Sequence, residues 1–276
     1  MLRRLINLCI SLGFWVVDSA AKFIRRILGE TNPGTCVVLY YHVVKTDHRE
    51  RFARQMDTLI RVARPISLDG APVWKSGNNY VAVTFDDGFQ GSIEIALPEL
   101  VRRNIPVTIF IPSGCLGLPA PWLENTKSPD YGGFVMNAEQ IKEIGKDELV
   151  SIGSHCVTHC RLLLLSEEEA KKEIFQSKLQ LESILGKKVK TMSFPHGAFN
   201  SRHVELARAA GYERVFSIVP SLAFCSPEEY VTGRVRVDPT EWRVEFRLKL
   251  SGAYRWLPLA SSLKHKVKSL IPGNQN

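Results

Sequence analysis

Residues 81–88, Val-Ala-Val-Thr-Phe-Asp-Asp-Gly, constrain the fold of this chain more than any other stretch. The β-branched and apolar run predicts a buried strand, which ends abruptly at the carboxylates of Asp86 and Asp87. Gly88 lets the backbone turn sharply behind them. Two adjacent acids repel each other unless a positive group, such as a metal ion, separates their roles. Taken alone, the stretch is also compatible with an ordinary strand followed by an Asp-Gly turn.

Two histidines four residues apart, His155 and His159, follow a second short apolar run that ends at Ile152. One turn of helix would place both imidazoles on the same face. Imidazole nitrogens and a carboxylate oxygen form a ligand set suited to zinc and related divalent ions. Together with the acid pair, the histidines favour a metal site. A structural zinc site with Cys156 and Cys160 is the alternative, but it leaves the acid pair unused.

A third short segment, residues 193–197, reads Ser-Phe-Pro-His-Gly and follows another strand-like run. Proline followed closely by glycine marks a tight loop. Backbone N–H groups in such a loop can face a ligand and hold a developing oxyanion.

In this order, Thr-Phe-Asp-Asp-Gly (84–88), His-x-x-x-His (155–159) and Phe-Pro-x-Gly (194–197) resemble the motifs of the polysaccharide deacetylases, the NodB-like family 4 carbohydrate esterases. The resemblance extends from about residue 37 to residue 237 and includes Leu-Tyr-Tyr-His-Val at 39–43. It implies a distorted, incomplete (β/α) barrel whose site lies at the carboxyl ends of the strands. It also implies metal-dependent hydrolysis of N-acetyl groups on amino sugars.

The resemblance implies a role for each motif residue. Asp87, His155 and His159 look like ligands of one divalent ion, zinc, with cobalt or nickel as alternatives. Asp86 looks like the base that deprotonates the attacking water. The backbone N–H of His196, where the family usually has tyrosine, looks like the oxyanion donor. Pro195 and Gly197 shape this loop beside the substrate.

The general acid is not found where the family often has it, in a Leu-x-x-His segment near the end of the domain; residues 262–265, Ser-Leu-Lys-His, have the wrong spacing. We therefore expect His42 or the side chain of His196 to protonate the leaving amine. Arg236, with its neighbours Arg234 and Asp238, is expected to orient the base or the acid. Trp122, in the loop-rich stretch 112–134, is expected to stack on a sugar ring or to pin the loop.

The alternation of about seven short strands with helices predicts a parallel α/β fold. The expected parts are an N-terminal amphipathic segment (1–30), the deacetylase-like domain (31–240) and a basic, apolar C-terminal extension (241–276). Within the domain, a continuous strand is expected at 231–237. A capping box at Ser166 and Glu169 predicts the start of a helix that Gly186 ends.

The net charge of +8 is concentrated at the two ends of the chain. Residues 1–30 carry five basic and two acidic side chains, and residues 243–276 carry seven basic and one acidic. The apolar residues of 1–29, with a polar face at helical spacing, predict a helix in a membrane interface. Its uninterrupted apolar run, 5–17, is shorter than the roughly 20 residues that cross a bilayer. A signal sequence and an ordinary packed helix remain alternatives. The C-terminal tail would be a second membrane contact or a helix packed across the barrel.

These features favour an anionic membrane surface as a partner over nucleic acid, because the body of the chain has no basic patch interleaved with aromatic residues. Six scattered cysteines favour a reducing compartment, hence the cytoplasmic rather than the periplasmic face of a bacterial inner membrane. We expect a peripheral N-deacetylase, a hydrolase of non-peptide C–N bonds, acting in exopolysaccharide biosynthesis on an N-acetylated polysaccharide or lipid-linked saccharide. Two alternatives are a degenerate carbohydrate-binding protein and a deacylase for formyl or O-acetyl groups.

Overall fold

The computed structural model describes residues 1–32, 34–69, 77–124 and 133–260. It contains one parallel sheet of nine strands in the order β8-β7-β6-β5-β4-β3-β1-β9, with β2 paired to β3. The predicted parallel α/β fold is confirmed, with two more strands than the seven expected. The strands are β1 (Thr35–Tyr41), β2 (Arg64–Pro65), β3 (Asn79–Phe85), β4 (Val107–Ile111), β5 (Val150–Ser154), β6 (Thr191–Ser193), β7 (Arg214–Phe216), β8 (Val231–Thr232) and β9 (Val235–Arg236).

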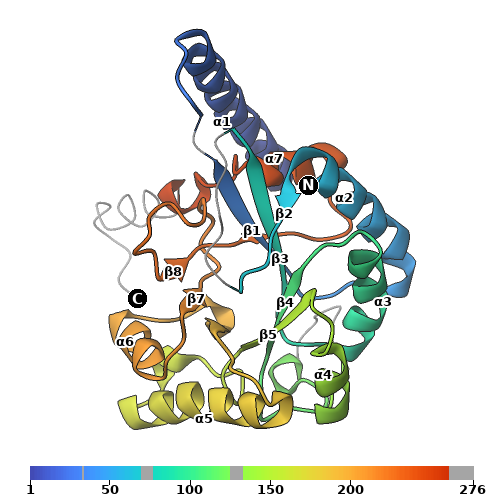
Figure 1. The fold of residues 1–276 in the computed structure, drawn as a ribbon, viewed down its shortest axis with the longest axis vertical. Coiled ribbons are helices and arrows are strands. Elements are labelled where there is room, and N and C mark those ends of the chain that lie inside the picture. The colour runs from blue at the N-terminus through green and yellow to red at the C-terminus, as the bar shows by residue number, and fades with distance from the viewer. Residues whose placement is uncertain (33, 70–76, 125–132, 261–276) are drawn as a thin grey trace.

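Helices surround the sheet, and α1 extends beyond it (Figure 1). The predicted capping box of α5 is present, since Ser166 and Glu169 accept hydrogen bonds from each other's backbone N–H groups, and Gly186 ends this helix at φ +65°. The helices are α1 (Leu2–Ile27), α2 (Arg49–Val62), α3 (Gln90–Val101), α4 (Ala138–Ile144), α5 (Glu167–Leu185), α6 (Ser201–Ala209) and α7 (Arg243–Leu250).

The central strands β1 and β3 pair along their whole length, from Thr35 opposite Asn79 to Tyr41 opposite Phe85. Both are buried except at their first residues, because helices cover one face and the barrel interior the other. Their carboxyl ends therefore deliver His42 and Asp86 to the same edge of the sheet. This edge, which we call the catalytic edge, also receives the end of β5.

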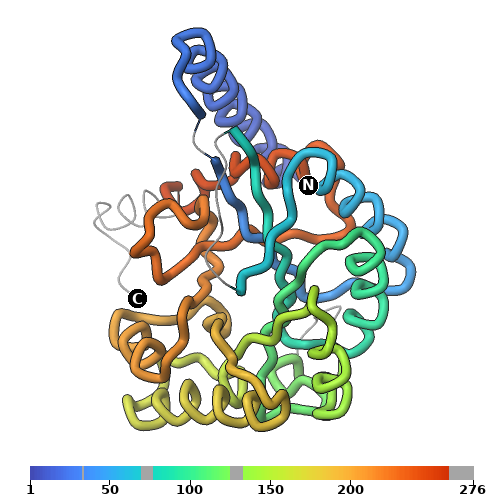
Figure 2. Tube along the Cα trace, in the orientation of Figure 1, coloured from blue at the N-terminus to red at the C-terminus, as the bar shows by residue number. Residues whose placement is uncertain are grey.

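One predicted strand is divided between the two ends of the sheet. Residues 231–237 were expected to form one strand, but they form β8 at one end of the sheet and β9 at the other. Only Gly233 and Arg234 separate them, and the chain there returns to β1 (Figure 2). A Cβ on Gly233 would lie 2.1 Å from the Val219 carbonyl oxygen, so a side chain does not fit at this crossing. The break turns Arg234 into the barrel.

The C-terminal segment as far as residue 260 packs onto the barrel. Helix α7 contacts α2 and α1, and its residues Phe246, Leu248 and Leu250 belong to the main hydrophobic core. Two arrangements were expected for this tail, and its described part has the second, a helix packed against the barrel. Residues 261–276, which include the segment 262–265, lie outside the described residues.

Candidate active site

The two adjacent acids at the end of β3 point to different surroundings. Asp86 continues the pairing of β3 with β1, because its backbone N–H donates to the Tyr41 carbonyl at 2.9 Å. Asp87 has φ +69° and Gly88 φ +61°, so the backbone turns sharply after Asp86. The turn directs the Asp86 carboxylate toward Arg234 and the Asp87 carboxylate toward His155 and His159.

The Asp86 carboxylate is bound by the guanidinium of Arg234 in a bidentate pair. Nη1 donates to Oδ1 at 2.7 Å and Nη2 to Oδ2 at 2.8 Å. Arg234 also donates to Thr84 Oγ1 at 3.0 Å and Ser193 Oγ at 2.6 Å, and its guanidinium lies over the Tyr40 ring. Burial raises the pKa of Asp86, but the charge and hydrogen bonds of Arg234, together with His155 and His42, outweigh it and hold the pKa below the usual value. Asp86 is thus a carboxylate at neutral pH.

The Asp87 carboxylate faces two imidazoles. Its Oδ1 lies 3.6 Å from His155 Nε2 and 3.1 Å from His159 Nε2, and all three side chains are buried. One ligand atom from each lies within 4.8 Å of the others. Burial opposes ionisation of Asp87, but the neighbouring histidines, His159 first, hold its pKa well below the usual value.

The two histidines do not lie on a helix, so the helical spacing assumed for them is wrong. Residues 155–159 form a loop after β5, and the left-handed backbone of Cys156 (φ +62°) and His159 (φ +57°) prevents a helical turn. Glu173 of α5 holds this loop in place. Its carboxylate accepts from the Val157 N–H at 2.8 Å, the Thr158 N–H at 2.9 Å and Thr158 Oγ1 at 2.8 Å.

His155 is held in one orientation by Nδ1, which lies 2.8 Å from the Ser193 carbonyl oxygen. Because a carbonyl only accepts, Nδ1 carries the proton and Nε2 offers its lone pair toward Asp87. Burial lowers the pKa of His155 to about 4, so the ring is neutral and can act as a ligand.

The three residues fit a divalent metal ion. Asp87 Oδ1 is buried and, among the described residues, has no hydrogen-bond partner, which is costly unless another group occupies the space beside it. A tetrahedral ion with ligand bonds of about 2.1 Å requires ligand atoms roughly 3.4 Å apart. The two distances from Oδ1 lie on either side of that value. The donor set suits zinc, and the carbonyl behind His155 is a typical outer partner of a zinc-bound histidine.

The loop after β6 brings His196 beside the metal ligands. Pro195–Gly197 form a short 3-10 turn, with His196 at φ +57° and Gly197 at φ +64°. A Cβ on Gly197 would lie 2.3 Å from Ile218 Cγ1, so glycine is required there. Within the described residues the His196 N–H has no hydrogen-bond acceptor. Its ring lies 4.6 Å from that of His159, and burial followed by the charge of His159 lowers its pKa.

The other predicted residues lie at different places. His42 is half-buried at the end of β1, near Asp86 and Asp87. Trp122 lies in a 3-10 turn, Pro121–Leu123, with its ring 4.1 Å from that of His159, so it covers a candidate ligand. Arg236 is exposed on β9, and none of its hydrogen bonds in the described part of the chain goes to Asp86. Of the two arginines expected to orient the base or the acid, Arg234 binds Asp86 and Arg236 does not.

Backbone strain is concentrated at this site. Six non-glycine residues in the described ranges have positive φ, and four of them, Asp87, Cys156, His159 and His196, belong to the acid turn, the histidine loop and the Pro195–Gly197 loop. Such conformations each cost on the order of 1–3 kcal/mol and persist where the surroundings impose them. Their clustering indicates that the fold is strained to hold these side chains together.

Two further contributors were not identified from the sequence. Glu173 lies in the middle of a helix whose regular pattern indicates only scaffold, and Ser193 acts on His155 through its carbonyl oxygen. Neither carries a local sequence signal. The contacts become visible only when α5 and β6 are placed next to β5.

Comparison with known proteins agrees with this geometry. The family model for polysaccharide deacetylase matches residues 75–215. YxkH of Bacillus subtilis is 27% identical over 165 residues, which cover 60% of this chain and 54% of YxkH. A poly-β-1,6-N-acetyl-D-glucosamine N-deacetylase of Staphylococcus aureus is 26% identical over 168 residues, 57% of this chain and 54% of that protein. The chain thus spans about half the length of these curated relatives.

Among solved structures, IcaB from Ammonifex degensii is similar with a TM-score of 0.65 and 25% identity. The likeness covers 80% of this chain and 97% of IcaB.

Proposed function

Because the chain belongs to the polysaccharide deacetylase family, we propose that it is a metal-dependent hydrolase that removes N-acetyl groups from the amino sugars of a bacterial polysaccharide. The observation that carries the proposal is the division of labour between the adjacent acids. Asp86 is held as a carboxylate by Arg234, while Asp87 has an oxygen that faces two imidazoles and has no hydrogen-bond partner among the described residues. This arrangement separates a base from a ligand, as hydrolysis of an amide requires.

Asp87, His155 and His159 would hold the metal ion, and zinc suits their donor atoms, with cobalt and nickel as alternatives. A bound divalent ion would polarise the acetyl carbonyl and lower the pKa of water from about 16 to about 7. The carbonyl of Ser193 keeps His155 in the tautomer that exposes Nε2. Glu173 keeps the loop that carries His159 in place.

Asp86 would accept the proton of the attacking water. Its two oxygens are fixed by Arg234, so the carboxylate is oriented before the substrate arrives and stays ionised at neutral pH. The His196 N–H would donate a hydrogen bond to the oxygen that becomes negative as the carbonyl is attacked. The strained turn at His196 and Gly197 keeps this N–H free of other acceptors in the described chain.

The leaving amine needs a proton. His42 and the side chain of His196 are the candidates, since both lie near Asp87 and neither is fully buried. The lowered pKa of His196 makes its ring mainly neutral at pH 7, which weighs against this side chain as the acid. Trp122 and Pro195 would form the wall against which the sugar lies, beside Gly197.

For the substrate, we propose an N-acetylhexosamine glycan, because a relative of this chain is named as a deacetylase of poly-β-1,6-N-acetyl-D-glucosamine. A lipid-linked saccharide is the second candidate. Location at the cytoplasmic face of an inner membrane stays a prediction, for which the support is the presence of six free cysteines.

The decisive experiment combines metal analysis with acetate release by the full chain. Oligomers of N-acetylhexosamine, their N-formyl counterparts and O-acetylated glycans serve as substrates. We expect one equivalent of metal and acetate release from the N-acetyl oligomers. Metal binding without turnover on any of them would indicate a carbohydrate-binding protein instead, and preference for the formyl or ester substrates would indicate a different deacylase.

A further inference from the structure

Helix α1 turns its polar side toward the protein. Arg4, Ser11 and Asp18 recur every seven residues and so share one face. Each bonds to the C-terminal segment: Arg4 Nε donates to Glu245 at 2.7 Å, Ser11 Oγ accepts from Trp256 Nε1 at 2.8 Å, and Asp18 accepts a bidentate pair from Arg255. These contacts span about 21 Å of helix axis. The helix therefore lies along the domain.

The opposite side of α1 is apolar and exposed, the reverse of a helix on a soluble protein. Arg3, Arg25 and Arg26 of α1 are also exposed, and its one acidic residue, Asp18, faces the domain. By length and composition α1 could also span a membrane, since only 6% of its most apolar stretch is buried. Its polar contacts, however, hold it along the side of the domain. The exposed apolar residues include Leu5, Ile6, Val16, Val17, Phe23, Ile24 and Ile27.

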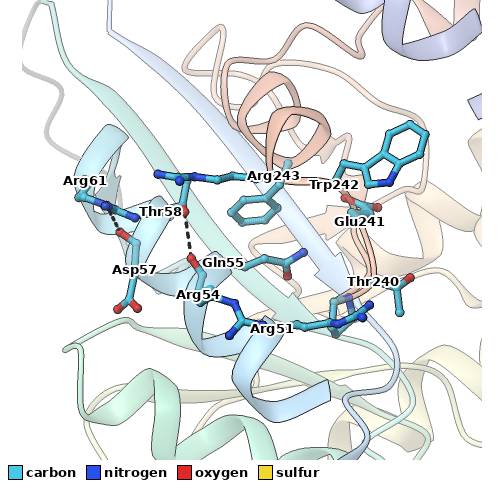
Figure 3. A pocket seen from close by; sticks show the side chains of 12 residues that line it. Arg51, Arg54, Gln55, Asp57, Thr58, Arg61, Thr240, Glu241, Trp242 and Arg243 are labelled. Atoms are coloured by element: carbon cyan, nitrogen blue, oxygen red, sulfur yellow. Dashed lines mark hydrogen bonds between the residues drawn. The ribbon is translucent and has the colours of Figure 1, made fainter. Parts of the chain in front are cut away.

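Beside α1, a groove between α2 and the start of α7 is lined by four arginines (Figure 3). We call it the arginine groove; it has a volume of about 490 Å³ and is lined by Arg51, Arg54, Arg61, Arg243, Thr240 and Trp242, among others.

The acids of the arginine groove are already neutralised. Asp57 binds Arg103 at 2.7 Å, and Glu241 binds Lys249. Arg51 and Arg243, by contrast, have no hydrogen-bonding or ion-pair partner for their side chains in the described residues. The groove therefore carries excess positive charge that the described part of the protein does not satisfy.

A second groove continues from the first. Arg243 lines both, and the second groove, of about 670 Å³, lies between α1 and α7. Its apolar walls are Leu12 and Trp15 of α1, Val62 of α2, and Val244 and Leu248 of α7, and we call it the apolar groove. Arg247 also lines it.

We propose that the two grooves together bind an anionic phospholipid of a membrane surface, with the headgroup in the arginine groove and an acyl chain in the apolar groove. A phosphate group satisfies unpaired guanidinium groups bidentately. An acyl chain covers the apolar walls beside it, and the outward face of α1 enters the same lipid layer. The arginine groove and the apolar groove adjoin each other, as the headgroup and the acyl chain of such a lipid do. A free anion or an acidic glycan would leave the apolar groove uncovered.

The test is co-sedimentation of the full chain with vesicles of phosphatidylcholine alone or of equal parts phosphatidylcholine and phosphatidylglycerol. We expect binding only to the second. The double variant Arg51→Gln/Arg243→Gln should bind about 25-fold more weakly, at about fivefold for each charge. The matched control Lys171→Gln/Lys172→Gln, on the outer surface of α5, should change binding by less than about twofold, because distant exposed charges are screened.

Further measurements separate the sources of the ligand and the contributions of the grooves. Phe23→Ser/Ile27→Ser, at two exposed positions, should abolish sedimentation while leaving thermal unfolding unchanged. Inorganic phosphate at constant ionic strength should not release the protein; release would identify a free-anion site and overturn the lipid assignment. Equal binding of wild type and the arginine variant would overturn it as well. Acetate release from a soluble oligomer should be the same in all these variants, so this inference and the proposed activity fail separately.

Discussion

Arg234 bridges from the break between β8 and β9 to Asp86 at the end of β3, with 2.7 and 2.8 Å hydrogen bonds to the two carboxylate oxygens. Neither residue is more than 2% exposed. The strand break that places Arg234 inside the barrel thus also fixes the candidate base. Closure of the barrel and orientation of the base depend on the same side chain.

Removing this arginine should therefore affect both stability and activity. Arg234→Met leaves the buried Asp86 unpaired, which should lower the free energy of unfolding by about 3–5 kcal/mol and kcat by at least about 100-fold. Chemical denaturation and acetate release measure the two effects. Arg236→Gln provides the comparison: its side chain is exposed, so we expect a change in stability of less than about 0.5 kcal/mol. An Arg236 variant as impaired as the Arg234 variant would contradict this assignment.

The adjacent acids should separate in a metal-binding experiment. Asp87→Ala should lose metal and activity together, because it removes one of three candidate ligands. Asp86→Asn should retain metal but lose activity by about 100- to 10,000-fold, because the amide cannot accept the proton of water. Metal content by mass spectrometry, measured beside acetate release, checks both. Metal loss in Asp86→Asn alone would reverse the assigned roles.

The fold was largely predictable because its signals are local. The buried run ending at Asp86, the capping box at Ser166 and the glycine end at Gly186 are each contained in a few residues, and each is found where expected. The division of 231–237 into β8 and β9 was not predictable. It depends on the two ends of the sheet meeting, so that only glycine fits at position 233, and a strand propensity cannot report that.

The same distinction applies to the site. His155, His159 and Asp87 were identified by residue type and order, and the structure brings them together. Their geometry was not predictable, because the spacing suggested a helical turn where left-handed residues and Glu173 form a loop. The sequence also could not show which of Arg234 and Arg236 binds Asp86. Alternation along a strand places these two on the same face, and the break reverses that expectation.

The stability of the metal-free protein should depend on the protonation of His155. Its pKa is about 4 in the folded protein and about 6.5 when unfolded, so between these pH values the unfolded chain binds more protons. The free energy of unfolding should thus fall as pH decreases from 6.5 to 4, by roughly 3 kcal/mol from this group. Burial raises the pKa of Glu241 to about 7, which acts in the opposite direction. The difference between wild type and His155→Gln, measured by denaturation in chelator, isolates the histidine; identical pH profiles would refute it.

The general acid should be revealed by its dependence on the leaving group. His42→Gln should slow hydrolysis of an N-acetyl sugar by about 100-fold or more, but only slightly affect an O-acetyl ester, whose leaving group needs less protonation. His196→Gly keeps a backbone that favours positive φ and retains the N–H, so it tests the side chain alone. We expect it to be the milder variant. If His196→Gly shows the leaving-group effect and His42→Gln does not, the acid is His196.

Trp122 should affect metal binding as well as the substrate, because its ring lies 4.1 Å from that of His159 and its buried Nε1 has no hydrogen-bond partner in the described residues. Trp122→Ala removes the cover over His159, so we expect metal affinity to fall about 10- to 100-fold, as when an outer partner of a ligand is lost. Trp122→Phe keeps an aromatic face and should retain metal. If the indole also stacks on the sugar, Trp122→Phe should raise KM with little change in kcat, because stacking is present in the bound substrate and in the transition state alike. Metal titration and steady-state kinetics at saturating metal distinguish these effects. Unchanged metal affinity in Trp122→Ala would restrict this residue to the substrate wall.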